Sequence, residues 1–153
     1  MTNFTSWGHT EEPTVTQFEQ QLGFKLPTDY RSFLLQNNGG SFKKQVFFVD
    51  DLKQDIMLGV LYGITNEKSV DLTIASWMEE YGDELQEDAL IIGADPGGGM
   101  LLYITAGEDM GIYYWDHAHF FSQSSEEEGN TYFVAPSFAA FCALLTDYKP
   151  VAS

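Results

Sequence analysis

The chain is poor in cysteine and in positive charge. Its one cysteine, Cys142, excludes an internal disulfide bond and a zinc site built from several thiolates. It has 7 lysine and arginine residues against 23 aspartate and glutamate residues, so its formal net charge is −16. No lysine or arginine lies between Lys68 and Lys149, whereas fifteen acidic residues do. Because such a surface repels phosphate groups, we expect no binding to nucleic acid or to an anionic membrane.

Long hydrophobic runs are also missing. No apolar run approaches the roughly 20 residues that a membrane-spanning helix needs. Residues 1–12 lack the basic start and the apolar stretch of a signal peptide. We therefore expect a cytoplasmic protein with one domain over residues 1–153, a core over about 14–148, and loosely ordered residues 1–12. An apolar content of 44% argues against disorder.

Helical periodicity occurs in four segments. The first helix is expected to begin at a capping box formed by Thr14 and Gln17, and to end at Gly23. A second helix follows with Thr28 as its cap. Two further helices are expected over residues 69–81 and, capped by Ser137, over residues 137–148.

Five apolar runs between these helices predict strands, over residues 45–50, 56–64, 89–94, 100–105 and 111–115. The last three are joined by the turn sequences DPGGG and AGEDMG. Such short connections require antiparallel neighbours, because a parallel crossover needs about a dozen residues. Strands that are apolar on both faces must also be covered on both faces. The predicted fold is therefore α+β, with a mostly antiparallel sheet packed with helices.

Motifs for catalysis or for cofactor binding are weak. The glycines of residues 97–99 open into a strand-like run and not into a helix, so a hairpin turn is favoured over a phosphate loop. Asp116, His117 and His119 could hold a metal ion, but no third strong ligand is evident nearby. Cys142 lies on an apolar helical stripe and is interpreted as a core residue and not as a nucleophile. We expect no catalytic residue, cofactor or metal.

Several motifs in the same order resemble the SUKH superfamily, which includes the fungal Smi/Knr regulators of cell-wall synthesis. The first motif covers residues 19–40, the second covers residues 90–117, and a closing helix begins at Ser137. The resemblance covers about residues 15–148 and implies a SUKH-like single domain. The matched residues, interpreted as determinants of turns and core, are Glu19, Gly23, Leu26, Pro27, Tyr30, Phe33, Asn38, Gly39, Gly40, Gly93, Gly98, Gly99, Tyr114, Trp115 and Asp116. Residues 130–133 carry no recognisable family feature.

The resemblance implies a binding protein without catalytic residues. Bacterial SUKH proteins are mostly cytoplasmic immunity proteins that neutralise a cognate polymorphic toxin, and a basic nuclease-type toxin would suit the acidity of this chain. A monomer or a weak homodimer is expected. The alternative is a regulatory scaffold that binds a housekeeping partner, as the fungal members do. The acidic residues expected to contact the partner are Glu79, Glu80, Asp83, Glu84, Glu87, Asp88, Asp95, Glu108 and Asp109.

Aromatic residues could supply the anchors of such an interface. Trp77 and Tyr81 lie close to the acidic residues in sequence, although their helical spacing favours the core. A second set could form a ligand platform and consists of Tyr113, Tyr114, Trp115, Phe120 and Phe121.

Overall fold

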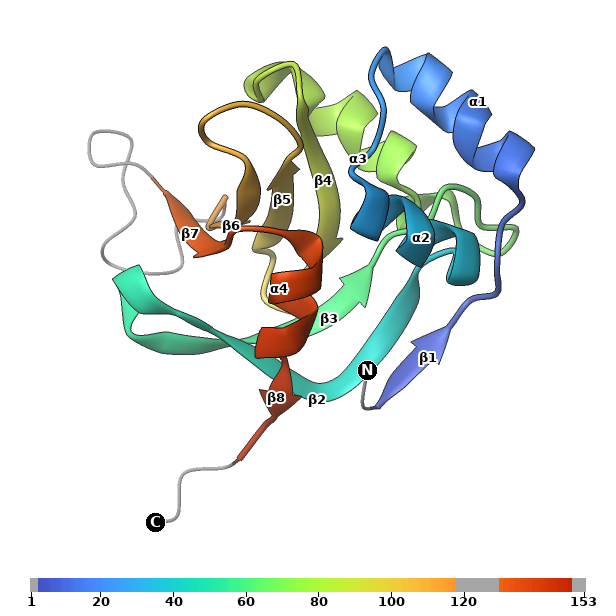
Figure 1. Ribbon diagram of the computed structural model, residues 1–153. Coiled ribbons are helices and arrows are strands. Elements are labelled where there is room, and N and C mark those ends of the chain that lie inside the picture. Colours follow the sequence, from blue (N-terminus) through green and yellow to red (C-terminus); the bar gives the residue numbers. More distant parts are fainter. Residues whose placement is uncertain (1–2, 118–129, 150–153) are drawn as a thin grey trace.

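A curled antiparallel sheet runs through the molecule, and helices pack on both of its faces (Figure 1). The computed structural model describes residues 3–117 and 130–149. The strands follow the order β1-β2-β3-β4-β5-β6-β7. Their bounds are Phe4–Ser6, Gly40–Val49, Gln54–Leu61, Ala89–Ala94, Met100–Ile104, Gly111–Trp115 and Thr131–Ala135, and β8, Thr146–Asp147, pairs with β2 beside β1.

Four α-helices lie in the described part of the chain: α1 (Glu12–Leu22), α2 (Thr28–Gln36), α3 (Ile74–Tyr81) and α4 (Phe138–Leu144). Three short 3₁₀ helices join the strands and α3, namely η1 (Asp50–Leu52), η2 (Val70–Leu72) and η3 (Gly82–Glu84). The predicted α+β class with a mostly antiparallel sheet is confirmed.

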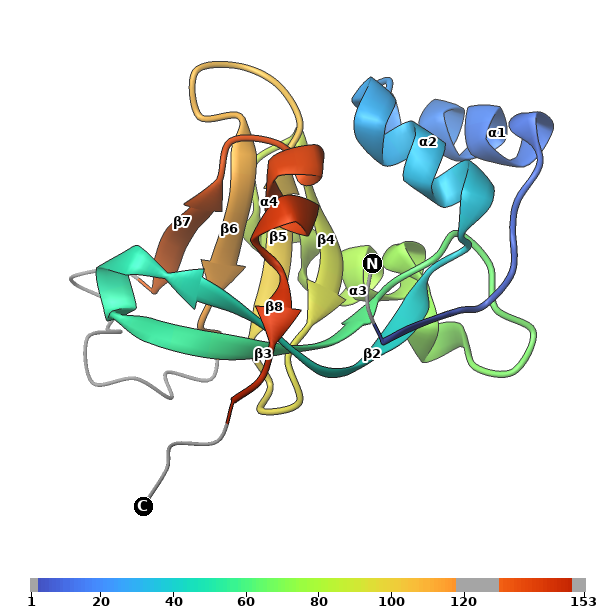
Figure 2. The same cartoon turned by 60° about the horizontal axis from the view of Figure 1, so that its bottom comes forward.

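The two faces of the sheet carry different helices. We call the face under α2 and α4 the inner face, and the face under α3 the outer face (Figure 2). On the inner face, Tyr30 of α2 lies 5.6 Å from Tyr103 of β5 and 5.0 Å from Phe138 of α4, between ring centroids. On the outer face, the sulfur of Met78 in α3 lies 3.3 Å from the backbone nitrogen of Ile91 in β4. Every residue of β5 is buried, because both of its faces are covered.

The start of α1 differs from the prediction, whereas Ser137 caps α4 as predicted. Helix α1 begins at Glu12, and Glu11 occupies its N-cap without a side-chain hydrogen bond. The capping box at Thr14 is therefore wrong, because Thr14 already lies in the first turn, next to Pro13. Proline is tolerated there since the first amides of a helix have no partner within it. The predicted end is confirmed: Gly23 has a φ of 86° and donates its amide to the Glu19 carbonyl.

Both ends of the chain pair with β2, which corrects two expectations. Residues 1–12 were expected to be loosely ordered, but Phe4–Ser6 forms β1, and Phe4 lies opposite Phe42. Gly40 permits this pairing, because a Cβ there would overlap the Phe4 ring. Helix α4 ends at Leu144, four residues earlier than predicted. Thr146–Asp147 forms β8 instead, where Asp147 accepts a hydrogen bond from the side-chain amide of Gln45 at 2.6 Å.

The residues that carry the family resemblance hold the helices in place. Glu19 of α1 accepts hydrogen bonds from the Leu26 amide at 2.7 Å and from the Arg31 Nε at 3.1 Å, so it joins α1, the connecting segment and α2. Asp29, at the start of α2, accepts the amide of Ala139 in the first turn of α4 at 2.9 Å. Tyr30 is buried between these helices. The motif therefore fixes the geometry of the inner layer.

A second contact of this kind joins the end of α2 to the segment after β3. The side chain of Asn38 accepts the amides of Ile64 and Thr65 and donates to Thr65. Gly39 has a φ of 78°, and a Cβ at Gly63 would overlap the Asn38 carbonyl. Only residues without a side chain let the two backbones come this close.

Candidate protein-binding surface

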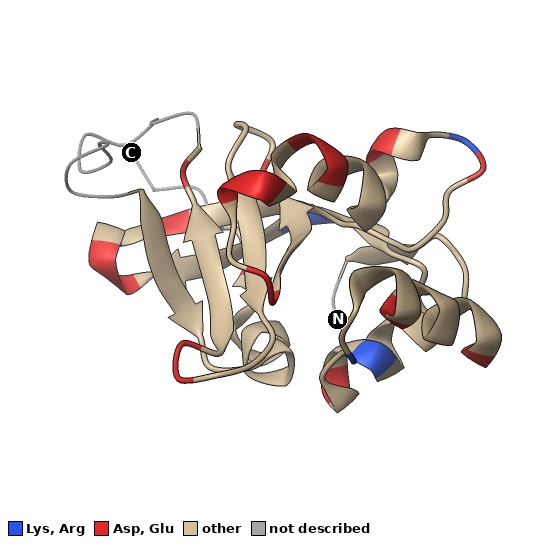
Figure 3. Ribbon diagram, turned by 90° about the horizontal axis from the view of Figure 1, so that it is seen from above, with Lys and Arg blue, Asp and Glu red and all other residues tan. Residues whose placement is uncertain are grey.

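Eight of the nine acidic residues predicted to contact a partner lie on α3, on η3 and in the segments that border β4, β5 and β6. Glu79 and Glu80 are on the last turn of α3, and η3 contributes Asp83 and Glu84. Glu87 and Asp88 follow just before β4. The remaining two, Glu108 and Asp109, lie in the turn between β5 and β6. We call these eight residues the acidic rim (Figure 3).

Antiparallel pairing brings Asp88 to the same end of the sheet as Asp109, whereas Glu84 lies 3.8 Å from His117, which follows the opposite end of β6. The start of β4 lies beside the end of β5, with Ala89 opposite Ile104. Just beyond this pair, the backbone carbonyl of Asp88 accepts the amide of Thr105 at 2.9 Å and its hydroxyl at 2.7 Å. The segment before β4 and the turn after β5 therefore leave the same end of the sheet, although they lie about 20 residues apart in sequence.

Asp95 is not part of the acidic rim. It lies in the turn between β4 and β5, at the end of the sheet opposite to Asp88 and Asp109. Its carboxylate accepts the amides of Gly97 at 2.7 Å and Gly99 at 2.9 Å, and the hydroxyl of Tyr114. A Cβ at Gly99 would overlap that hydroxyl. Burial, followed by the hydrogen bond to Asp95, raises the pKa of Tyr114, so its hydroxyl stays protonated as a donor. This arrangement organises a turn.

An aromatic cluster lies beneath the rim on the outer face. The indole of Trp77 is stacked between Tyr62, at 5.6 Å, and Tyr81, at 6.0 Å, and its Nε1 donates to the Asp71 carbonyl at 2.6 Å. Tyr81 in turn meets the edge of Trp115 in β6 at 6.1 Å. Trp77 and Tyr81 are only partly buried. They thus serve the core and also reach the surface.

His117 connects β6 to this cluster. Its ring lies 4.7 Å from the rings of both Tyr81 and Trp115, between centroids. Its Nε2 lies 3.8 Å from a carboxylate oxygen of Glu84 in the rim. Asp116, immediately before it, is fully buried and its amide donates to the Asn130 carbonyl at 2.8 Å. The end of β6 is therefore held from both sides.

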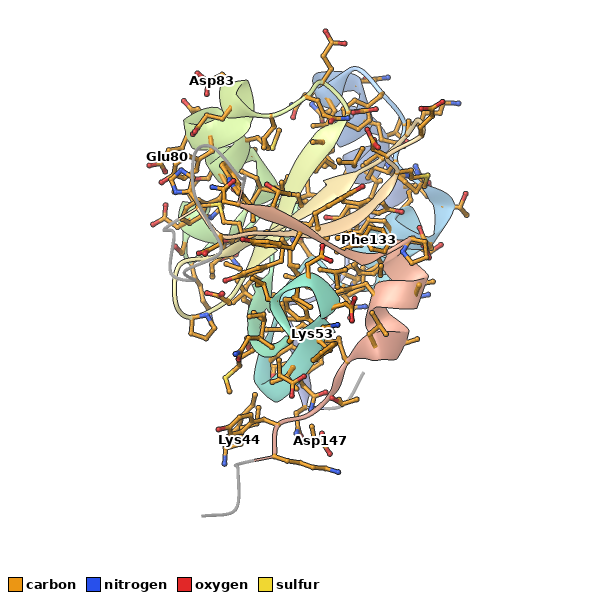
Figure 4. The ribbon with its side chains drawn as sticks, turned by 90° about the vertical axis from the view of Figure 1, so that its left-hand side faces the viewer. Lys44, Lys53, Glu80, Asp83, Phe133 and Asp147 are labelled. Atoms are coloured by element: carbon orange, nitrogen blue, oxygen red, sulfur yellow. The ribbon has the colours of Figure 1, made fainter. Side chains whose placement is uncertain are left out.

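The described residues carry little positive charge near the rim. Arg31 is paired with Glu12 and Glu19, on the helices α1 and α2. Lys53 is paired with Asp50 at 2.8 Å, beyond the far end of β2. Figure 4 shows Lys44 near Asp147 at one end of the molecule, and Glu80 and Asp83 at the other. The acidic rim thus keeps an uncompensated negative potential.

Comparison with known proteins identifies the family of the chain. Residues 10–143 match the model of the SMI1 / KNR4 family (SUKH-1). The chain belongs to this family. It is also 23% identical over 152 residues to an SPbeta prophage-derived uncharacterized protein, YokK, of Bacillus subtilis (strain 168), with 87% of this chain and 73% of that protein covered. Membership of the SUKH-1 family supports an immunity-type protein that acts on a protein partner, and the family is generally non-enzymatic.

The residues considered for metal binding and catalysis do not form a cluster in the described part of this SUKH-1 chain. Within residues 3–117 and 130–149, no three histidine, cysteine, aspartate or glutamate side chains are grouped so that they could hold a metal ion. His119, Phe120 and Phe121 lie outside the described residues. Cys142 is half-buried in α4, and burial raises the pKa of its thiol to about 11, which disfavours the nucleophilic thiolate. None of the described helices is long and apolar enough to cross a membrane.

One candidate contact residue, Phe133, was not predicted from the sequence. Phe133 lies on β7, opposite Tyr113 of β6, and 47% of its surface is exposed. The sequence does indicate a strand here, because the run TYFVA at 131–135 is rich in β-branched and aromatic residues. Its pairing with β6 across the intervening residues could not be read from this pattern.

Proposed function

We propose that this SUKH-1 chain is an immunity protein that binds a cognate polymorphic toxin and neutralises it through the acidic rim. The toxin is of a basic, nuclease type. The observation that supports this most directly is the gathering of eight carboxylates on α3, on η3 and in the segments that border β4 and β5, in a chain with no lysine or arginine between Lys68 and Lys149.

The physical argument concerns how two charged surfaces meet. A nuclease binds phosphates through a basic cleft, so a rim of carboxylates is complementary to that cleft. Complementary potentials raise association rates by about 10- to 1000-fold at low salt. They also place negative charge where the nucleic acid would bind, and thereby block the substrate. The rim does this without contributing a reacting group of its own.

Co-expression with the toxin encoded beside this gene tests the proposal. We expect cells that produce both proteins to survive and the two proteins to co-elute on gel filtration. Continued killing together with no complex would contradict it. A stable complex with a non-toxic housekeeping protein, in the absence of any toxin gene beside this one, would instead indicate a regulatory scaffold.

Charge-neutralised variants test the role of the rim. In one variant, three exposed rim residues become amides: Asp83→Asn, Glu87→Gln and Asp109→Asn. The matched control carries the same change of charge away from the rim, at three exposed residues: Asp51→Asn, Asp55→Asn and Glu67→Gln. We expect the rim variant to associate with the toxin at least about tenfold more slowly at low salt, and the control to associate almost as fast as the wild type.

Salt provides an independent measurement. Steering between surface charges is screened beyond about 8 Å at physiological ionic strength. The association rate of the wild type should therefore fall as salt rises, and that of the rim variant should fall much less. Equal salt dependence in the two proteins would show that the rim does not face the toxin.

A further inference from the structure

Among the described residues, helices cover only part of the outer face of the sheet. Helix α3 lies over β4, where Met78 meets Ile91. Figure 3 looks onto this face and shows α3 crossing it, while none of the described helices lies over β6 and β7. On this face β6 and β7 present Tyr113 and Phe133, which lie opposite each other and therefore on the same side of the sheet.

These two rings form an ordered pair. Their centroids are 5.6 Å apart at an interplanar angle of 79°, a favourable edge-to-face arrangement. The hydroxyl of Tyr113 donates to the Asp109 carbonyl at 2.7 Å, which ties the ring to the turn of the acidic rim. A Cβ at Gly111 would lie 3.1 Å from the Phe133 ring, so the ring lies close against the backbone there. The pair is held by its neighbours and needs little ordering before a partner can bind.

Phe133 is exposed in spite of this order, whereas Tyr113 is half-buried. Phe133 is 47% exposed and Met110, two residues before Ile112 in β6, is 38% exposed. The side chains of Glu108 and Asp109 lie exposed in the adjoining turn. An exposed apolar patch that is rimmed by polar residues is typical of a protein-binding surface. Interface hot spots are rigid aromatic residues of this kind, surrounded by polar residues that exclude water.

We infer that Tyr113 and Phe133 form the centre of the contact with the toxin, and that they receive an apolar side chain that is surrounded by lysine or arginine residues. The inference rests on the proposed function and adds which residues contribute most of the binding energy of the complex. Charge complementarity selects this occupant, because the aromatic pair adjoins Glu108 and Asp109 on the same surface. Trp77 is a weaker candidate, because its ring is stacked on both sides and its Nε1 is already bonded.

The test compares two phenylalanines of equal exposure. Phe48, on β2, is also 47% exposed, but it lies opposite Asp55, near η1 and away from the acidic rim. We would measure the binding of wild type, Phe133→Ala and Phe48→Ala to a catalytically inactive form of the toxin domain encoded beside this gene. The expected result is a dissociation rate at least about tenfold higher for Phe133→Ala, and less than about twofold higher for Phe48→Ala.

A second pair of variants covers the case in which truncation at position 133 disturbs β7. Phe133→Lys keeps a long side chain and places a positive charge against the basic toxin, whereas Phe48→Lys does the same at the control position. Circular dichroism and thermal melting would establish that both variants are folded. We expect Phe133→Lys to weaken the complex more than Phe133→Ala does, and Phe48→Lys to leave it unchanged.

The outcomes separate this inference from the proposed function. If the wild type does not bind the toxin, both are wrong. If the wild type binds and the Phe133 variants bind equally well, only the aromatic centre is wrong. Sedimentation that shows a wild-type homodimer, lost in Phe133→Ala, would make the pair a contact between two copies of this chain and would also overturn the inference.

Discussion

Replacing Asp95 with alanine should destabilise the protein without affecting the proposed complex with a toxin. The substitution removes the hydrogen bonds from Gly97, Gly99 and Tyr114 to one carboxylate. A hydrogen bond to a charged group is worth about 1.5–3 kcal/mol, and partial exposure of Asp95 lowers this to about 1 kcal/mol for each. We therefore expect the free energy of unfolding to fall by about 3 kcal/mol. For a chain of this length, the melting temperature should fall by roughly 6–12 °C.

Urea and thermal unfolding, followed by circular dichroism, measure this change. The control is Asp109→Ala in the turn between β5 and β6, where the side chain is exposed. Its unfolding free energy should change by less than about 0.5 kcal/mol. In binding to the proposed toxin the order should be reversed: Asp109→Ala should associate more slowly than the wild type, and Asp95→Ala should associate at the wild-type rate. A destabilisation below about 1 kcal/mol for Asp95→Ala would refute the idea that its bonds organise the turn.

Two further predictions concern the core. Gly63→Ala should lower the free energy of unfolding by about 3 kcal/mol, because the added methyl group overlaps the Asn38 carbonyl. The control Gly97→Ala should lower it by less than about 1 kcal/mol. Equal urea midpoints for the two variants would contradict this prediction. Burial, followed by the charge of Asp29, raises the pKa of Tyr103 to about 12, above its unfolded value of about 10. The contribution of Tyr103 to the free energy of unfolding is therefore complete below pH 10 and is lost as the pH rises from 10 to 12. In urea unfolding experiments over that pH range, the free energy of unfolding of Tyr103→Phe should therefore fall less steeply than that of the wild type.

Sequence patterns were most reliable where turn residues bound an apolar run. The strand Gly111–Trp115 occurs as predicted, and the strand Met100–Ile104 differs by one residue. The turn sequences on either side leave few other choices for these segments. The short strands β1 and β8 were not predicted, because their conformation depends on pairing with a distant strand and not on their own composition.

The grouping of the candidate acidic residues was predictable in part. Contiguity in sequence was enough to group Glu79 to Asp88, and the hairpin of β5 and β6 implied that Asp109 lies at the same end of the sheet as Asp88. The same reasoning would have placed Asp95 at the opposite end, because one strand length separates it from Asp88. The pairing of Tyr113 with Phe133 could not be predicted, since 19 residues separate them and register is set by the assembled sheet.

Along one edge, strand β2 pairs with two segments that lie far apart in the sequence. Residues near position 5 and residues near position 147 occupy the same edge, and the contact of Gln45 with Asp147 spans 102 positions. Loops of this size must close before that edge is complete, so folding should be slow compared with that of a helical protein of equal size.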